Sequence, residues 1–351
     1  MEGTSMIHPR LAGLGAAALL AVGAVGACGE AENPSTVAAR TAAAEAPQLP
    51  AGRIAFRRWL DDAKTRGAIF TVRTDGTGER QLTQPGAGAD DYPDWSPDGR
   101  LIAYQHCPGP EDPCSVWTVD PDGGRPHQIR FHCRLTPICD AAAPAWTPHG
   151  KLLVTLAQGR ERTIGGEPQI QQSSIEQIDL RTGTQRTIYT RTGWAGDAID
   201  AQVSPDGRTV IYTSWNSARS RPPFGRAMFA VGMDGSHRHR VTAWKLGGGD
   251  HPVFSPDGLI LFRTFEDDES RQSDFWNVRS NGRGLERLTR FKKGTLVTSA
   301  SYSPDGAWIV YGSDGDGGAD LYVMRADGTG RRLLTRTPWW DSAPDWEPVS
   351  H

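Results

Sequence analysis

A short motif recurs six times along this 351-residue chain, and it limits the possible fold more than any other feature. In each copy an aromatic or apolar residue precedes Ser-Pro-Asp-Gly or a variant of it. The copies begin at Tyr92, Ala143, Gln202, His251, Ser301 and Ala343. Strand-like runs follow several copies, as in 101–104, 209–212 and 308–311. Because self-similarity at a regular spacing is typical of repeat architectures, the repeat unit has to be interpreted first.

A second signature lies between these copies: a β-rich run that ends in Asp-Gly, Asn-Gly or Thr-Gly. The turn glycines lie at 76, 123, 183, 235, 282 and 328, which gives spacings of 47, 60, 52, 47 and 46 residues. Asp-Gly and Asn-Gly between strands are strong hairpin signals, since both central positions of the turn tolerate a positive φ. A unit of four strands with a period of about 40–50 residues is typical of a propeller blade. We therefore expect an all-β, six-bladed β-propeller.

The two ends of the repeat region are complementary. The last copy, which ends at Trp346-Glu347-Pro348, has a first strand without a second, and residues 52–56 supply a second strand without a first. Pairing the two would build the last blade from N- and C-terminal strands and remove an exposed sheet edge. The alternative is an open, incomplete array.

The first fifty residues have a different character. Residues 11–27 are rich in Ala, Leu, Val and Gly and follow Arg10, and this stretch is short for a spanning helix. Its end, Val25-Gly26-Ala27-Cys28, resembles the lipobox of bacterial lipoproteins, and the resemblance implies cleavage before Cys28 and diacylation of its sulfur. We expect a lipoprotein signal peptide over 1–27, a disordered tether over 28–50 and a propeller over 51–351. An ordinary cleavage site followed by an incidental cysteine is the alternative.

The Trp-Ser-Pro-Asp-Gly motifs resemble the repeats of the TolB-type β-propeller family over about residues 51–351. The resemblance implies a six-bladed, usually exported propeller that acts mainly as a platform for protein interactions. It is specific for the fold and not for one activity. Periplasmic TolB also has an α/β domain ahead of its propeller, where this sequence has the lipobox and the tether. We therefore expect a TolB-like lipoprotein rather than TolB.

Composition excludes several classes of function. Lys and Arg number 38 against 41 acidic residues, a net charge of −3, so no excess of positive charge favours nucleic acid. Hydrophobic residues make up 37%, enough for a packed domain and too few for a polytopic membrane protein.

The serines and aspartates of the motif are interpreted as turn formers. Pro presets φ, Asp bonds the backbone ahead of it, and Gly takes the positive φ that the reversal requires. This structural role covers Ser96, Asp98, Ser204, Asp206, Ser255, Asp257, Ser303 and Asp305. His149 replaces Asp in the second copy and is interpreted as a tolerated surface substitution.

Four cysteines besides Cys28 form an even set in a chain that we expect to be exported, which favours disulfides. Of the three possible pairings, Cys107–Cys114 with Cys133–Cys139 closes two short loops and is preferred. Zinc binding is the alternative, although no Cys-x-x-Cys spacing is present.

Acidic residues precede several copies of the motif, where the innermost strands of a propeller begin. We expect them to ring one mouth of the central channel, together with Trp340. They are Asp90, Asp91, Asp140, Asp197, Asp200, Asp250 and Asp341. Clustered carboxylates suit Ca²⁺, with Asp91, Asp250 and Asp341 as ligands, or a basic segment of a partner. The alternative is that each carboxylate faces water or a neighbouring amide.

Two other patterns have ordinary structural explanations. The segment 314–320 has acids at alternate positions but lacks the later Glu of an EF-hand loop, so a hairpin turn is favoured. His237 and His239 share a strand face without a third ligand and are expected to be solvated.

No nucleophile elbow, zinc-protease motif or P-loop is present, so we expect no enzyme and no resident cofactor. The favoured function is an extracytoplasmic binding module, monomeric and held to the membrane by its lipid anchor, that binds an envelope protein or peptide. An accessory sensor for a transporter or kinase would differ only in its partner. The alternative is a carbohydrate-binding or lyase-like propeller that stacks sugars on exposed rings. The candidate rings are Trp194, Trp215, Trp244, Trp339 and Trp340.

Overall fold

A computed structural model describes residues 48–109, 112–164, 167–192, 198–215, 225–246, 248–265, 272–315 and 318–349. The predicted signal peptide, with Cys28 and the tether up to residue 47, lies outside the described residues. In the described part no helix is long and apolar enough to cross a membrane.

The described chain is built almost entirely of β-strands, as the repeat predicted. The first seven are β1 (Arg53–Trp59), β2 (Gly67–Arg73), β3 (Arg80–Gln81), β4 (Ala89–Trp95), β5 (Ile102–Cys107), β6 (Ser115–Val119) and β7 (His127–Gln128). The next eight are β8 (Ile138–Trp146), β9 (Leu152–Ile164), β10 (Glu167–Asp179), β11 (Thr184–Thr192), β12 (Ala198–Val203), β13 (Thr209–Trp215), β14 (Arg226–Gly232) and β15 (His239–Arg240). A short 3-10 helix, η2 (Trp244–Leu246), follows. The last nine are β16 (Gly248–Phe254), β17 (Leu259–Phe265), β18 (Ser273–Arg279), β19 (Glu286–Arg287), β20 (Val297–Tyr302), β21 (Trp308–Ser313), β22 (Asp320–Arg325), β23 (Arg332–Leu333) and β24 (Asp341–Trp346).

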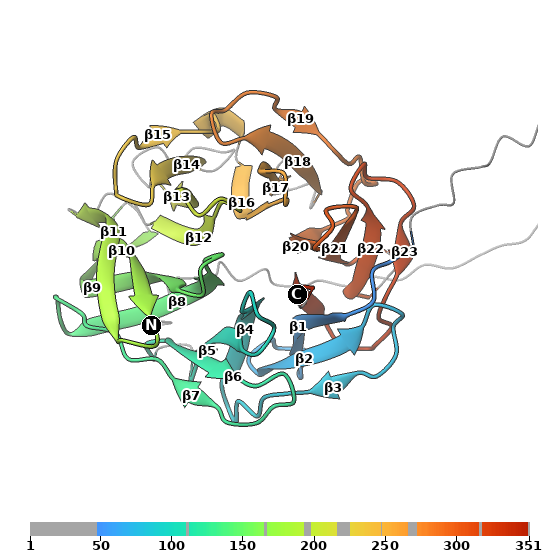
Figure 1. Cartoon of the computed structure of the whole chain (residues 1–351), viewed down its shortest axis with the longest axis horizontal. Coiled ribbons are helices and arrows are strands. Elements are labelled where there is room, and N and C mark those ends of the chain that lie inside the picture. The colour runs from blue at the N-terminus through green and yellow to red at the C-terminus, as the bar shows by residue number, and fades with distance from the viewer. Residues whose placement is uncertain are drawn as a thin grey trace, which may run out of the picture.

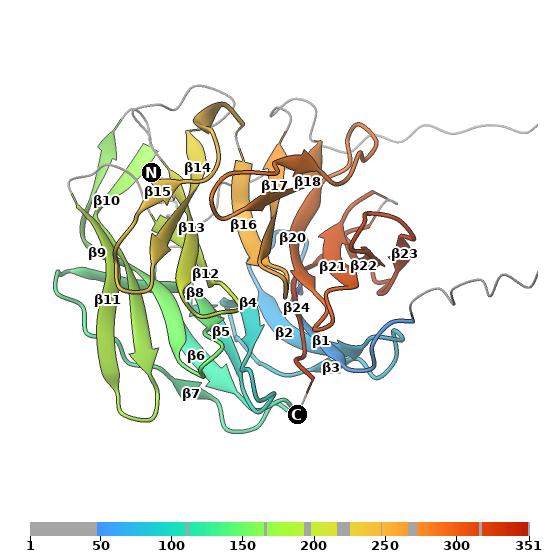
Figure 2. The same ribbon diagram turned by 45° about the horizontal axis from the view of Figure 1, so that its top comes forward.

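Consecutive strands pair antiparallel within radially placed sheets (Figures 1 and 2). Four sheets have four strands each: β8–β11, β12–β15, β16–β19 and β20–β23. A fifth sheet has eight strands, and in it β2 contacts β4 through one parallel pair, Gly67 with Ala89. The strands that carry the motif, among them β4, β12, β16 and β20, lie nearest the centre in Figure 1. This arrangement brings equivalent motif residues from distant parts of the chain close together.

The two ends of the described chain meet in one sheet. Strand β24 pairs antiparallel with β1, with Ile54 opposite Trp346 and Arg58 opposite Asp341. The pair is reinforced where the Arg53 guanidinium donates to the Glu347 carboxylate at 2.6 Å. Strands from residues 53–59 and 341–346 therefore behave as neighbours although almost the whole chain separates them.

The hydrophobic core lies between adjacent sheets rather than in one central cluster. Ile54 and Phe56 of β1, for example, pack in one cluster with Val310 and Leu321 of the preceding sheet. A similar cluster joins Ile175 of β10 to residues of β12, β13 and β14. Because each sheet buries both faces against its neighbours, the sequences of the strands are nearly continuous runs of apolar residues.

The motif turns have the local contacts that the sequence predicted. In the first copy the Ser96 hydroxyl donates to Asp98 Oδ1 at 2.7 Å, and the Leu101 amide donates to Ser96 Oγ at 2.9 Å. Gly99 takes φ 67°, a conformation that favours glycine. The same Ser–Asp bond recurs in the copies that contain Ser204, Ser255 and Ser303. The structural interpretation of these residues is confirmed.

Two further expectations concern turns and histidines. Asp314 and Asp320 flank the connection from β21 to β22. Residues 316 and 317 of this connection lie outside the described part. The Asp314 carboxylate accepts a hydrogen bond from the Leu296 amide at 2.7 Å. His239 is exposed and its ring bonds the Ser280 carbonyl at 2.9 Å. His149 is also exposed, in agreement with a surface substitution.

Candidate functional site

A cavity of about 540 Å³ lies at the centre of the ring of sheets. Residues of β4, β8, β12, β16, β20 and β24 line it, and most belong to the repeated motif. Nine of the lining residues are prolines: Pro93, Pro144, Pro148, Pro205, Pro252, Pro256, Pro304, Pro344 and Pro348. The walls are therefore largely apolar and stiff, with carboxylate, imidazole, amide and hydroxyl groups among the other lining side chains. Such a composition is typical of pockets that recognise ligands.

Five of the lining residues share an unusual backbone conformation. Tyr92, Ala143, Asp200, His251 and Ala343 have φ values of 50°, 47°, 53°, 46° and 51°, in the left-handed region. They occupy the same motif position, where the pairing of each motif strand with its neighbour shifts register. A left-handed conformation costs a non-glycine residue about 1–2 kcal/mol. The strained conformation therefore recurs at one position of the repeat, and the residues at that position line the cavity.

Three of these left-handed residues meet across the cavity. The rings of Tyr92 and His251 lie 5.2 Å apart between centroids, and His251 Nδ1 lies 3.4 Å from Asp200 Oδ2. The three residues come from β4, β16 and β12, so no short sequence pattern connects them. Together they offer an aromatic face, an imidazole and a carboxylate to a ligand in the cavity.

Two half-buried carboxylates form part of the cavity wall. Asp94 accepts a bond from the Trp146 amide at 2.6 Å, and Asp345 accepts one from the Trp95 amide at 2.8 Å. Each bond therefore joins one motif strand to the next around the ring. Burial, and then repulsion from Asp345, raises the pKa of Asp94 well above its usual value. Burial also raises the pKa of Asp345.

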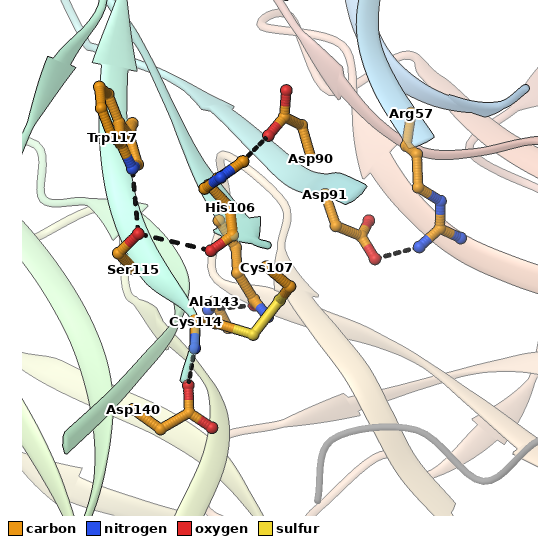
Figure 3. The surroundings of a disulfide bond; sticks show 11 residues. Arg57, Asp90, Asp91, His106, Cys107, Cys114, Ser115, Trp117, Asp140 and Ala143 are labelled. Carbon is orange, nitrogen blue, oxygen red and sulfur yellow. Dashed lines mark hydrogen bonds and ion pairs between the residues drawn. A yellow bond between two sulfur atoms is a disulfide. The ribbon is translucent and has the colours of Figure 1, made fainter. Parts of the chain in front are cut away.

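Among the predicted mouth acids whose side chains the structure describes, Asp200 alone contributes to the cavity lining. Asp90 bonds His106 at 2.7 Å, and Asp91 forms an ion pair with Arg57 (Figure 3). Each of these two acids is almost fully buried. Such carboxylates serve structural contacts instead of facing a shared opening.

The other predicted mouth residues have separate surroundings. Asp140 accepts a bond from the Cys114 amide at 2.9 Å, and burial raises its pKa to about 6 (Figure 3). Asp341 pairs with Arg58 at 2.7 Å. Trp340 lies under the ammonium of Lys64. Asp197 and the side chain of Asp250 lie outside the described residues.

The predicted calcium ligands are not gathered in the part of the chain that the structure describes. No group of three His, Cys, Asp or Glu side chains with metal-binding geometry occurs among the described side chains. Asp91 and Asp341 already have guanidinium partners, Arg57 and Arg58. Calcium binding that involves Asp250 stays a prediction.

All four described cysteines form disulfides, Cys107–Cys114 and Cys133–Cys139. The pairing preferred from the sequence is present, and the zinc alternative is wrong because the thiolates it needs are consumed. Gln105 links the first disulfide to the cavity wall. Its side-chain amide donates a hydrogen bond to Cys107 Sγ at 3.0 Å. The same side chain accepts a bond from the amide of Ala143 at 3.2 Å.

The aromatic candidates of the carbohydrate alternative are dispersed. Trp244 is half-buried and packs against the core beside Phe229, with ring centroids 5.9 Å apart. Trp339 is exposed. Trp194 and the side chain of Trp215 lie outside the described residues.

The sequence analysis missed the residues that line the cavity, chiefly Tyr92, His251, Asp94 and Asp345. Their positions in the repeat could have indicated them. Tyr92 and His251 lie four residues before the Ser of their motif copies. Asp94 lies two residues before Ser96, and Asp345 lies two residues before Glu347, which replaces Ser in the last copy. Alternation along an inner strand would have placed these positions on one face, had the register shift been foreseen.

Radial antiparallel sheets around a cavity lined by their innermost strands define a β-propeller. Residues 199–350 match the family described as the TolB beta propeller domain, PD40. Over 96 residues the chain is 35% identical to the Tol-Pal system protein TolB of Anaeromyxobacter sp. strain K and to that of Anaeromyxobacter dehalogenans strain 2CP-1. This segment covers 27% of the chain and only 21% of each relative's length.

Solved structures agree on the fold. TolB from Acinetobacter baumannii has a TM-score of 0.62 at 21% identity, covering 85% of this chain and 67% of that one. Hydrazine synthase of Kuenenia stuttgartiensis has a TM-score of 0.65 at 13% identity, covering 86% and 47%. A putative TolB from Agrobacterium tumefaciens has a TM-score of 0.55 at 17% identity, covering 85% and 99%. The chain contains a TolB-like β-propeller, and the range of these neighbours shows that the fold alone does not define an activity.

Proposed function

We propose that the strands form six blades of a closed propeller. The eight-stranded sheet would contribute two blades, one of β24, β1, β2 and β3 and one of β4 to β7, and each four-stranded sheet one more. The pairing of β1 with β24 supports closure through the chain ends. A closed ring holds the cavity-lining residues at constant spacing, which a binding site requires.

We further propose that this propeller is a monomeric, non-enzymatic protein of the bacterial cell envelope that binds a protein or peptide partner at its central cavity. The Tol-Pal relatives support a partner of this kind. Two disulfides support an oxidising, extracytoplasmic compartment. The near balance of charges gives no support to nucleic acid as a partner.

The left-handed residues carry this proposal. Backbone strain persists where the surrounding structure holds it, and it gathers at binding and active sites. Here Tyr92, Asp200 and His251 share the strained position and all line the cavity. Ala143 and Ala343 hold the same position on β8 and β24, the inner strands on either side of β4, and leave space next to Tyr92. A segment of polypeptide that enters the cavity would meet the aromatic and charged side chains of Tyr92, Asp200 and His251, with room beside Tyr92 for its own side chains.

Site-specific photo-crosslinking in intact cells tests the proposal. The crosslinking amino acid p-benzoylphenylalanine replaces Tyr92 in the cavity or, as a matched control, exposed Arg240 on β15. We expect a discrete adduct from position 92, identified by mass spectrometry, and none of the same mass from position 240. Adding Asp200→Arg should remove the adduct, because it reverses a charge in the cavity. Equal adducts from both positions, or none from position 92, would refute cavity binding.

We also propose lipid attachment at Cys28 and calcium binding, and each has its own test. Lipid attachment at Cys28 predicts incorporation of an alkyne-tagged fatty acid that Cys28→Ser abolishes, and retained labelling would contradict it. Calcium binding at the predicted mouth acids predicts a higher melting temperature in CaCl2 than in NaCl of equal ionic strength. An unchanged melting temperature would remove calcium from the proposal.

A further inference from the structure

A second pocket, of about 330 Å³, lies away from the central cavity. Asp61, Asp62 and Lys64 contribute from the connection between β1 and β2. Trp339 and Trp340 contribute from the segment just before β24. The pocket wall therefore combines aromatic and charged side chains, and none of these five residues lines the central cavity.

The backbone of the two tryptophans is held by hydrogen bonds. The carbonyl of Trp340 accepts a bond from the Trp59 amide at 2.9 Å, and Asp341 follows it as a fully buried residue of β24. The Trp339 amide donates to Thr337 Oγ1 at 3.2 Å. These bonds hold the backbone that carries the two rings.

Trp339 is also unusual for its exposure. It is 39% exposed, and it is the only aromatic among the large hydrophobic side chains classed as exposed in the described ranges. An indole left in water beside a pocket offers apolar area that binding of a partner would bury.

A cation already occupies the face of the second ring. Lys64 Nζ lies 3.3 Å from the centroid of Trp340, well within the distance of a cation–π interaction. Lys64 is exposed and sits in a left-handed conformation, φ 54°, on a turn closed by its amide and the Asp61 carbonyl at 3.2 Å. The ammonium is therefore brought to the ring by an exposed turn, whereas the ring belongs to the rigid sheet.

Apart from Lys64, the charged groups of this pocket are carboxylates: Asp61, Asp62 and Asp314. An aromatic face next to carboxylates attracts a positive charge on an alkyl chain, and Lys64 shows that an ammonium fits. An anion would meet repulsion here, and a neutral ligand would make no use of the charges.

We propose that this pocket, hereafter the Trp339–Trp340 pocket, binds the side chain of a lysine from a partner protein. Lys64 is its tethered competitor: it covers Trp340 in the free protein and leaves when the partner's lysine enters. The site does not depend on the function assigned to the central cavity.

Nuclear magnetic resonance of the tryptophan indole N–H groups tests this inference, with Nα-acetyl-lysine N-methylamide as the probe. Lys64→Ala removes the competitor, and Lys64→Arg keeps a cation there as the matched control. We expect saturable shifts of the Trp339 and Trp340 signals, with an affinity about three- to tenfold higher in Lys64→Ala than in the natural protein or Lys64→Arg. The norleucine analogue of the probe, which lacks the charge, should give none.

The inference fails if Lys64→Ala binds the probe no better than Lys64→Arg, or if Trp340→Leu in the Lys64→Ala background binds equally well. Trp340→Phe keeps an aromatic ring and should retain weaker binding of the probe. It is the control for loss of binding that is caused by a disturbed fold and not by loss of the ring. Tighter binding of choline than of the lysine probe would assign the pocket to a quaternary ammonium and overturn the lysine assignment. Binding of a neutral sugar at Trp339, unaffected by Lys64→Ala, would also overturn it.

Discussion

The ion pair between Arg58 and Asp341 joins the N-terminal strand β1 to the C-terminal strand β24, and its removal is the sharpest test of how the ring is held together. Arg58 Nε lies 2.7 Å from Asp341 Oδ1, and a second nitrogen lies 2.9 Å from Oδ2. Asp341 is 0% exposed and Arg58 only 5%. The guanidinium also pairs with Glu79 at 2.6 Å, but that carboxylate is 38% exposed.

Replacement of Arg58 by Met keeps most of the side-chain volume and leaves the Asp341 carboxylate buried without its cation. Removing one partner of a buried ion pair costs about 3–5 kcal/mol. Burial already raises the pKa of Asp341, and Arg58 opposes that effect. The variant can therefore escape part of the cost by protonating Asp341, so the loss of stability should be larger at pH 8 than at pH 5.

Equilibrium unfolding in guanidinium chloride, followed by tryptophan fluorescence, measures this loss as a lower midpoint. Glu79→Gln is the matched control, because it removes the exposed partner of the same guanidinium and should cost about 1 kcal/mol or less. The double variant Arg58→Met/Asp341→Leu should recover most of the stability, since an apolar pair replaces the ionic one. The reasoning is refuted if Arg58→Met costs no more than Glu79→Gln, or if the cost does not depend on pH.

Three further predictions address single features of the fold. Asp140 has its pKa raised by burial to about 6 from 3.8, so its contribution to stability is present below pH 3.8 and is lost as the pH rises through about 6. Asp140→Asn should therefore raise the free energy of unfolding at pH 8 by ~1–3 kcal/mol and not at pH 3.5, and an equal change at both values would contradict this. Ala143→Gly should stabilise by about 0.5–1 kcal/mol because φ is 47°, whereas Ala142→Gly on the same strand should destabilise; thermal melting decides between them. Removing the Cys107–Cys114 disulfide as a double serine variant should cost about 2–3 kcal/mol in urea unfolding, and an unchanged midpoint would show that the loop needs no cross-link.

Features that depend on neighbours in the chain could be predicted from the sequence. The Ser96–Asp98 bond spans two residues, and its recurrence made each turn recognisable. The disulfides close loops with sequence separations of 7 and 6 residues, so short-range proximity selected the pairing. Such contacts join residues a few positions apart, so they can be recognised without knowing how the rest of the chain packs.

The predicted mouth acids illustrate the limit. Their place before the motif was visible, but their partners were not: Arg57 reaches Asp91, and Arg58 reaches Asp341 from 283 positions away. A carboxylate at the start of an inner strand can face water, an ion or a buried guanidinium. The choice between these depends on which strand packs beside it.

By itself the sequence determined the repeat, the strands and turns within it, the local disulfides and the resemblance to TolB-type propellers, because each is encoded in short motifs and their spacing along the chain. Only the tertiary structure decided which side chains share the central cavity, and it brought Tyr92, Asp200 and His251 together from three strands. Register shifts in the inner strands aim those side chains inward, and packing of the sheets around the ring sets the distances between them. These are properties of the assembled sheets, and no single repeat contains them.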